Sequence, residues 1–82
     1  MSKSVFTERY NRFRQLLIKA RQETRLTQSE LSKKLSRPQS YVSKYERGER
    51  RLDVIEFLEV AEALQIEPET FIKTLVEETQ EQ

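Results

Sequence analysis

Hydrophobic residues recur along the first quarter of the chain at alternating intervals of four and three positions. An α-helix places residues at these intervals on one face, because each turn takes between three and four residues. The pattern therefore predicts an amphipathic helix from about Thr7 to Thr24. Its apolar stripe consists of Phe6, Tyr10, Phe13, Leu17 and Ala20.

Two later segments each begin with a capping residue that is followed three positions on by glutamate. In such a capping box the first side chain accepts a hydrogen bond from the backbone N–H of the glutamate, whose carboxylate accepts one in return. Thr27 with Glu30 and Asp53 with Glu56 therefore predict two helix starts. Hydrophobic residues flank each box at the spacing of a staple, namely Leu26 with Leu31 and Leu52 with Phe57.

A break separates the helix that starts at Thr27 from a third helix. The apolar pattern of the earlier helix stops at Leu35, and residues 36–38 form the break. Pro38 is expected at the cap or in the first turn of the third helix, residues 38–47, because proline is tolerated there. These two helices are expected to pack into the core, the first through Leu31 and Leu35 and the second through Val42 and Tyr45.

Two further helices complete the pattern. One is capped by Asp53, and the last runs from Glu69 to about Glu78 after a proline. No alternating pattern predicts a strand, so we expect an all-α domain of five helices over residues 1–82, with a compact core over about 6–78 and flexible ends. The buried face of the fourth helix is expected to consist of Phe57, Leu58, Ala61 and Leu64. The apolar residues of the last helix are Phe71, Ile72, Leu75 and Val76.

Composition removes several classes of function. The chain contains no cysteine and no histidine, which argues against disulfides, thiol chemistry, histidine-based catalysis and the common zinc sites. Its single glycine cannot form a glycine-rich phosphate loop. The longest aliphatic run, residues 16–18, is too short for a signal peptide or a membrane span. We therefore expect a cytoplasmic protein that is not an enzyme and has no cofactor, no metal and no membrane partner.

Charge is distributed unevenly along the chain. Residues 1–51 hold 14 Lys and Arg against 5 Asp and Glu, whereas residues 52–82 hold only Lys73 against 9 acidic residues. A basic half suggests a surface that faces a polyanion, with the acidic half turned away from it. The alternative is an ordinary solvated surface of mixed charge.

Residues 27–47 contain two short helical patterns across a tight break, which is the arrangement of a helix-turn-helix that reads a DNA major groove. The second helix carries hydrogen-bonding side chains on the face opposite its core. Gln39 is suited to adenine, because its amide can donate to one base atom and accept from another, and Lys44 is suited to guanine. A plain solvent-exposed polar face is the alternative. The outward residues are Gln39, Ser40, Ser43, Lys44 and Arg47.

The sequence resembles the XRE family, whose helix-turn-helix fold is that of lambda-type phage repressors and Cro proteins. The resemblance covers about Phe13 to Leu75 and is carried by residues 26–31, 42–50 and 61–64, which contain Leu-Thr-Gln-x-x-Leu, Val-Ser-x-Tyr-Glu-Arg-Gly-Glu-Arg and Ala-Glu-Ala-Leu. It implies a prokaryotic or phage-derived, nucleoid-associated transcriptional regulator of the repressor kind. Such a protein binds double-stranded DNA at an inverted repeat as a homodimer.

The resemblance also implies roles for individual residues. Gln39 would be the main base reader, Gln28 would bond a phosphate and could brace Gln39, and Arg21 with Glu46 would form a structural ion pair. Tyr41 is open to two interpretations, core packing or a contact with DNA. The expected base contacts are Gln39, Ser40, Ser43 and Lys44. The expected backbone contacts are Thr27, Gln28, Lys34, Arg37, Tyr41, Arg47 and Arg50.

This chain departs from the family pattern where glycine is frequent, at Arg25, Ser36 and Gln65. Arg25 and Gln65 follow helix ends, where a left-handed residue is common. Either each non-glycine residue there adopts the left-handed conformation at a cost of about 1 kcal/mol, or those ends are built differently. Arg37 stands where the family usually has an apolar residue, and it adds a cation near the expected DNA backbone.

The last helix is the candidate for association between subunits. Phe71 and Leu75 are expected to close the core, and the dimer contact is predicted at Ile72, Leu75 and Val76. Two half-sites would then lie about 34 Å apart. The alternative is a protein-interaction module that binds a partner through residues 54–76, such as the antitoxin of a toxin–antitoxin pair. A restriction–modification controller protein is a further alternative within the same family.

Overall fold

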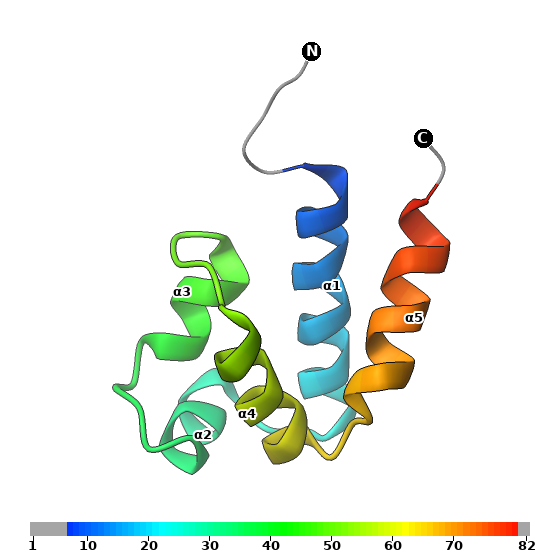
Figure 1. The fold of residues 1–82 in the computed structure, drawn as a ribbon. Helices are drawn as coiled ribbons and strands as arrows, with labels where there is room; N and C mark the ends of the chain where they lie inside the picture. Colours follow the sequence, from blue (N-terminus) through cyan, green and yellow to red (C-terminus); the bar gives the residue numbers. More distant parts are fainter. Residues whose placement is uncertain (1–6, 81–82) are drawn as a thin grey trace.

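The computed structural model describes residues 7–80, and five α-helices account for most of them (Figure 1). No strand occurs in this range, so the prediction of an all-α fold with five helices is confirmed. Phe6 of the predicted apolar stripe lies outside the described residues. Helices α1 and α5 lie side by side, and α2 and α3 form a separate pair beside them. The helices are α1 Glu8–Glu23, α2 Gln28–Lys34, α3 Tyr41–Arg47, α4 Val54–Leu64 and α5 Pro68–Thr79.

Both predicted capping boxes are present. The Thr27 hydroxyl accepts from the Glu30 N–H at 3.0 Å, and the Glu30 carboxylate accepts from the Thr27 N–H at 2.9 Å. At α4, Asp53 accepts from the Glu56 N–H at 2.7 Å, and Glu56 accepts from the Asp53 N–H at 3.1 Å. Each cap satisfies backbone donors that a helix leaves unpaired, which contributes about 1 kcal/mol. These boxes explain why the observed helix starts match the predicted ones.

The prediction that α3 begins at Pro38 is wrong, because the helix begins at Tyr41. The Tyr41 N–H donates to the Pro38 carbonyl at 2.9 Å, which closes a tight turn. The first helical bond of α3 runs from the Lys44 N–H to the Ser40 carbonyl at 2.9 Å. Proline therefore fixes the turn before the helix and does not occupy its first turn. Gln39 lies in this turn.

The core is built from one stripe of each helix. Three phenylalanines join α1, α4 and α5, with ring centroids 5.6 Å apart for Phe13 and Phe57 and 5.1 Å apart for Phe57 and Phe71. The prediction that Leu58 is buried is wrong, because 41% of it is exposed, whereas Val60 is fully buried. Leu58 lies about 100° around the helix from Phe57, on the side of α4 that faces solvent. The buried apolar residues of α2 to α5 include Leu31, Val42, Tyr45, Ala61, Leu64 and Leu75.

Three non-glycine residues adopt the left-handed conformation that glycine favours. The φ angles of Arg25, Ser36 and Gln65 are 64°, 58° and 60°. These are the three positions where the sequence departs from the family pattern, so the strained alternative is the correct one. The connections between α1 and α2, α2 and α3, and α4 and α5 therefore each carry local strain.

Replacing Gln65 with glycine is expected to raise the free energy of unfolding by about 0.5–1 kcal/mol. Glycine removes the cost of the left-handed conformation, although its greater freedom in the unfolded chain offsets part of the gain. Urea denaturation followed by circular dichroism measures the change. Gln65→Ala is the matched control, because it removes the same side chain but keeps the strain. An equal gain in both variants would assign the effect to the side chain instead.

Candidate nucleic-acid interface

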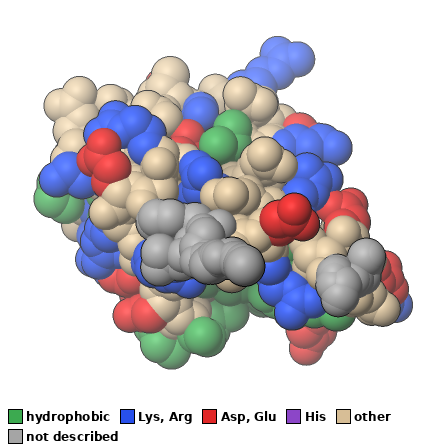
Figure 2. Space-filling view, turned by 90° about the horizontal axis from the view of Figure 1, so that it is seen from above, with side chains coloured by type: hydrophobic (Ala, Val, Ile, Leu, Met, Phe, Trp, Pro, Cys, Tyr) green, Lys and Arg blue, Asp and Glu red, His purple; other side chains and the backbone are tan. Residues whose placement is uncertain are grey.

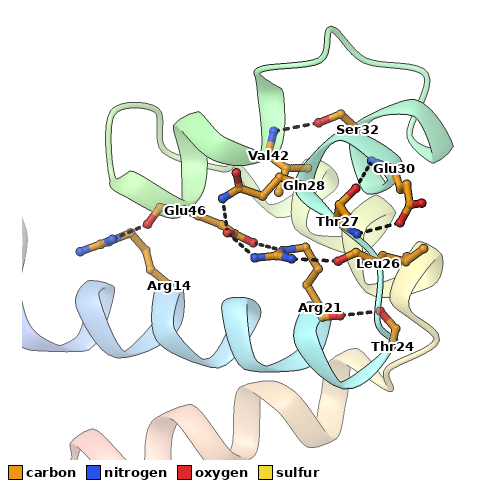
Figure 3. Close-up of polar contacts among 10 residues, drawn as sticks. All are labelled: Arg14, Arg21, Thr24, Leu26, Thr27, Gln28, Glu30, Ser32, Val42 and Glu46. Atoms are coloured by element: carbon orange, nitrogen blue, oxygen red, sulfur yellow. Dashed lines mark hydrogen bonds and ion pairs between the residues drawn. The ribbon is translucent and has the colours of Figure 1, made fainter.

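A buried hydrogen bond joins the two helices of the helix-turn-helix. The Val42 N–H donates to the Ser32 hydroxyl at 3.1 Å, and Ser32 is completely buried (Figure 3). The Arg37 N–H donates to the Ser32 carbonyl at 2.9 Å, so Ser32 holds both sides of the turn. The sequence interpretation missed this residue. Its position beside Leu31, three residues before Leu35 on the apolar face of α2, was the available signal.

Glu46 is the centre of a polar network beneath α3. Its carboxylate accepts from Arg21 Nε at 2.8 Å and Arg21 Nη2 at 3.1 Å, and from Gln28 Nε2 at 2.8 Å (Figure 3). Arg21 also donates to the Leu26 carbonyl at 2.8 Å, and Arg14 donates to the Glu46 carbonyl. The ion pair that the family resemblance implies is therefore present, and only 5% of Glu46 is exposed. The network attaches α3 to α1 and to the start of α2.

The outward side chains of α3 and its preceding turn lie together beside the start of α2. Gln39, Ser40 and Ser43 line a shallow hollow with Gln28 and Ser29. The Gln39 amide donates to the Ser29 hydroxyl at 3.1 Å. The prediction that Gln28 braces Gln39 is wrong, because the Gln28 amide donates to buried Glu46 and Ser29 takes the bracing position.

The other predicted base contacts are also accessible. Ser40 and Lys44 are exposed, and Ser43 is partly exposed while its hydroxyl donates to the Ser40 carbonyl at 3.1 Å. Arg47 is exposed at the end of α3, where it forms a bidentate ion pair with Glu49, both bonds being 3.0 Å long. These residues form a polar face that contains hydrogen-bond donors and acceptors.

Two arginines flank the ring of Tyr41 at the start of α3. The guanidinium carbons of Arg37 and Arg50 lie 4.9 Å and 5.1 Å from the ring centroid. Tyr41 itself is only 6% exposed, so it belongs to the core, and burial raises the pKa of its hydroxyl. Of the two interpretations of Tyr41, core packing matches the structure.

Each of these arginines is held by a glutamate of α4. Arg37 contacts Glu59 at 3.0 Å, and Arg50 contacts Glu56 at 2.6 Å. The hydrogen bonds from Arg50 and from the Asp53 N–H lower the pKa of Glu56 to about 2, so Glu56 is ionised at neutral pH. The remaining predicted backbone contacts are exposed at Thr27 and Lys34 and half-buried at Gln28.

The charge pattern led us to expect the acidic half to face away from the polyanion, but two of its glutamates lie against arginines of the predicted interface. Ion pairs join Arg12 to Glu78 and bring the two α4 glutamates against cations of the predicted interface. Figure 2 shows basic and acidic side chains intermixed at one end of the molecule. The tertiary structure therefore neutralises part of the charge asymmetry that the sequence displays.

A hydrophobic surface extends across α4 and α5. Its α5 part, Ile72 and Val76, is exposed at 41% and 39%, whereas Leu75, predicted at the same surface, is buried in the core. Hydrophobic side chains also gather at the lower edge of Figure 2. The sequence interpretation did not single out Val54 and Ile55, which follow the capping residue of α4 and are exposed at 71% and 64%. We call this surface the α4–α5 patch, and it consists of Val54, Ile55, Leu58, Ile72 and Val76.

No helix among residues 7–80 is long and apolar enough to cross a membrane. The same residues contain no group of three or more metal-ligating side chains.

A family model and a solved structure both match this chain. The model of the helix-turn-helix family matches residues 17–71. A solved structure described as an XRE-family like protein from Pseudomonas syringae pv. tomato str. DC3000 is 44% identical, with a TM-score of 0.83 and coverage of 87% of each chain. No curated protein matches the sequence. Residues 17–71, which the family model matches, contain Arg21, Gln28 and Glu46 of the polar network. They also contain the whole of α2, α3 and α4 and the start of α5.

Proposed function

This chain belongs to the XRE family of helix-turn-helix proteins, which makes it a DNA-binding regulator of that kind, and we propose that it recognises a specific operator in double-stranded DNA. The operator is an inverted repeat that a homodimer occupies, and transcription is regulated by that occupancy. Phosphate contacts hold the protein on the duplex, and the residues around the start of α3 select the sequence.

One observation carries this proposal, namely the accessible polar face at the start of α3. Gln39 lies in the turn that precedes the helix and is oriented by Ser29, with Ser40 and Lys44 exposed beside it. In a helix-turn-helix the N-terminal end of the second helix contacts base edges. Amide and ammonium groups are the side chains that discriminate between bases in the major groove.

Selection of bound duplexes from a random DNA pool tests the proposal. We expect enrichment of an inverted repeat, and affinity for it that falls steeply with salt because bound phosphates release counterions. Weak binding that is independent of sequence would contradict the assignment of a specific operator. The salt series also separates specific from nonspecific binding, since nonspecific binding depends almost entirely on the salt-dependent release of counterions.

We propose that the α4–α5 patch is the homodimer contact. A hollow between α4 and α5 is lined by Val54, Leu58 and Ile72, with Glu69 and Lys73 also on its wall. Lys73 is the only lysine or arginine of residues 52–82. In a two-fold dimer the same patch meets itself, so Lys73 of one copy can pair with an acidic residue of the other while the apolar residues are buried. The patch thus carries both parts of a self-complementary contact.

The dimer is tested by replacing Ile72 with glutamate. Placing a charge in the centre of the patch is expected to convert a dimeric protein into a monomer with unchanged helical content, because an unpaired charge is costly to bury. Sedimentation equilibrium gives the mass, and circular dichroism gives the helicity. Thr70→Glu adds the same charge to an exposed position of α5 and should remain dimeric. A monomeric wild-type protein at micromolar concentration would contradict the proposed dimer.

The same patch favours a second candidate function, that of an antitoxin or other protein-binding module. A partner of another sequence would then occupy the hollow between α4 and α5. This function predicts a stable heterocomplex that is lost in Ile72→Glu but unaffected by substitution of Gln39 or Lys44. Operator binding and partner binding can occur in one protein, so the two assays are read separately.

A further inference from the structure

We propose that Glu59 is an internal competitor for DNA phosphate, which lowers the affinity of the protein for DNA by holding Arg37. This inference rests on the proposed function of DNA binding. It assigns to an acidic residue of α4 a role in setting affinity. Three observations support the inference. Glu59 pairs with Arg37, Arg37 lies beside the start of α3, and the fold does not depend on the Glu59 side chain.

Arg37 lies where a phosphate contact is expected. Its guanidinium lies over the ring of Tyr41, the first residue of α3, at the helix end that approaches the groove. Arg50 lies near the same ring, so two cations are gathered at this point. A pair of guanidinium groups beside the start of a recognition helix is suited to bidentate contacts with phosphate oxygens.

In the free protein the carboxylate of Glu59 already pairs with the guanidinium of Arg37. Glu59 Oε1 accepts from Arg37 Nη2 at 3.0 Å, and both side chains are partly exposed, so a phosphate oxygen can replace the carboxylate. DNA binding then either breaks this pair or places the Glu59 charge near the phosphate. Both outcomes reduce the affinity, and both reduce the net number of counterions that the complex releases.

Glu59 is the better of the two α4 glutamates for this role. Glu56 also holds an arginine, but its carboxylate completes the capping box of α4 and is needed for the helix start. The Glu59 side chain forms no hydrogen bond or ion pair among residues 7–80 other than the one with Arg37. Its replacement therefore changes the interface with little effect on the fold.

The test compares Glu59→Gln with Glu62→Gln on two duplexes of equal length, one carrying the selected operator and one a scrambled sequence. Glu62 lies one helical turn further along α4, lines the same surface hollow with Arg37 and pairs with no described residue. Glu59→Gln is expected to bind both duplexes about two- to fivefold more tightly at low salt. The gain should shrink as salt rises, and the salt slope should steepen by up to about 1. Glu62→Gln should give a clearly smaller gain.

Two further variants complete the test, namely Arg37→Gln alone and Arg37→Gln combined with Glu59→Gln. In Arg37→Gln the Glu59→Gln substitution should add nothing, because the residue that Glu59 holds is gone. Equal gains in Glu59→Gln and Glu62→Gln, or a full gain in the Arg37→Gln background, would overturn the inference while leaving the proposed function intact. Failure of the wild-type protein to bind either duplex would overturn the proposed function and the inference together.

Discussion

Replacing Glu46 with alanine is expected to lower the free energy of unfolding by about 3–5 kcal/mol. The Glu46 carboxylate accepts three hydrogen bonds from Arg21 and Gln28, and its side chain is 4% exposed. Its removal leaves Arg21, whose side chain is only 13% exposed, without its negative partner. A loss of this size is a large part of the total stability of a domain of this length, which is about 4–12 kcal/mol. The variant is therefore expected to be partly unfolded at 37 °C.

Glu49→Ala is the matched control for this prediction. Glu49 also accepts two hydrogen bonds from an arginine, Arg47, but both side chains are more than half exposed. A solvated pair of this kind contributes little to stability, because water replaces the lost partner. Urea denaturation of the two variants measures the difference. Similar losses in both variants would mean that burial of the Glu46 network does not decide its contribution.

Replacing Gln39 with alanine is expected to cost about 1–3 kcal/mol of binding free energy at the operator and to relax selection at one base pair. The Gln39 side chain is exposed, and the Ser29 hydroxyl fixes one end of its amide. Alanine cannot form the pair of hydrogen bonds with a base edge that an amide can. The cost should therefore appear on the selected operator and disappear on a variant operator whose contacted base pair is already wrong.

Lys34→Gln provides the contrast for Gln39→Ala. Lys34 is exposed at the end of α2, and its ammonium group is suited to a phosphate. Its loss should weaken all sequences alike and reduce the salt slope by about 1. Affinities for a set of operator variants at several salt concentrations distinguish the two patterns. Uniform weakening in Gln39→Ala would remove this residue from the role of base reader.

Local signals explain which parts of the fold could be predicted. The capping boxes at Thr27 and Asp53 fix helix starts by bonds within four residues, and the observed starts agree. The start of α3 lacks such a box, since Ser40 makes no side-chain cap, and there the prediction was wrong by three residues. The phase of α4 was also assigned incorrectly at Leu58, because a run of apolar residues does not reveal which of them faces the core.

The candidate site was predictable in its residues and in the Arg21–Glu46 ion pair, which the family resemblance implied, but not in its other pairings. The face around Gln39, Ser40 and Lys44 follows from helical geometry, and the structure leaves it accessible. The brace of Gln39 by Ser29 depends on how the turn before α3 is placed against α2, which no local rule gives. The same is true of Arg37, whose partner Glu59 lies 22 residues further along the chain.

By itself, the sequence determined the helices, the helix-turn-helix and the family, because these depend on caps, periodicity and motif spacing within short segments. Apart from the Arg21–Glu46 pair, the tertiary structure alone decided which charges meet. The sequence separates 14 basic residues in one part from 9 acidic residues in the other, yet α4 folds its glutamates against Arg37 and Arg50. Only the packed arrangement brings such distant charges within the few ångströms at which they interact strongly, so the electrostatics of the interface follow from packing.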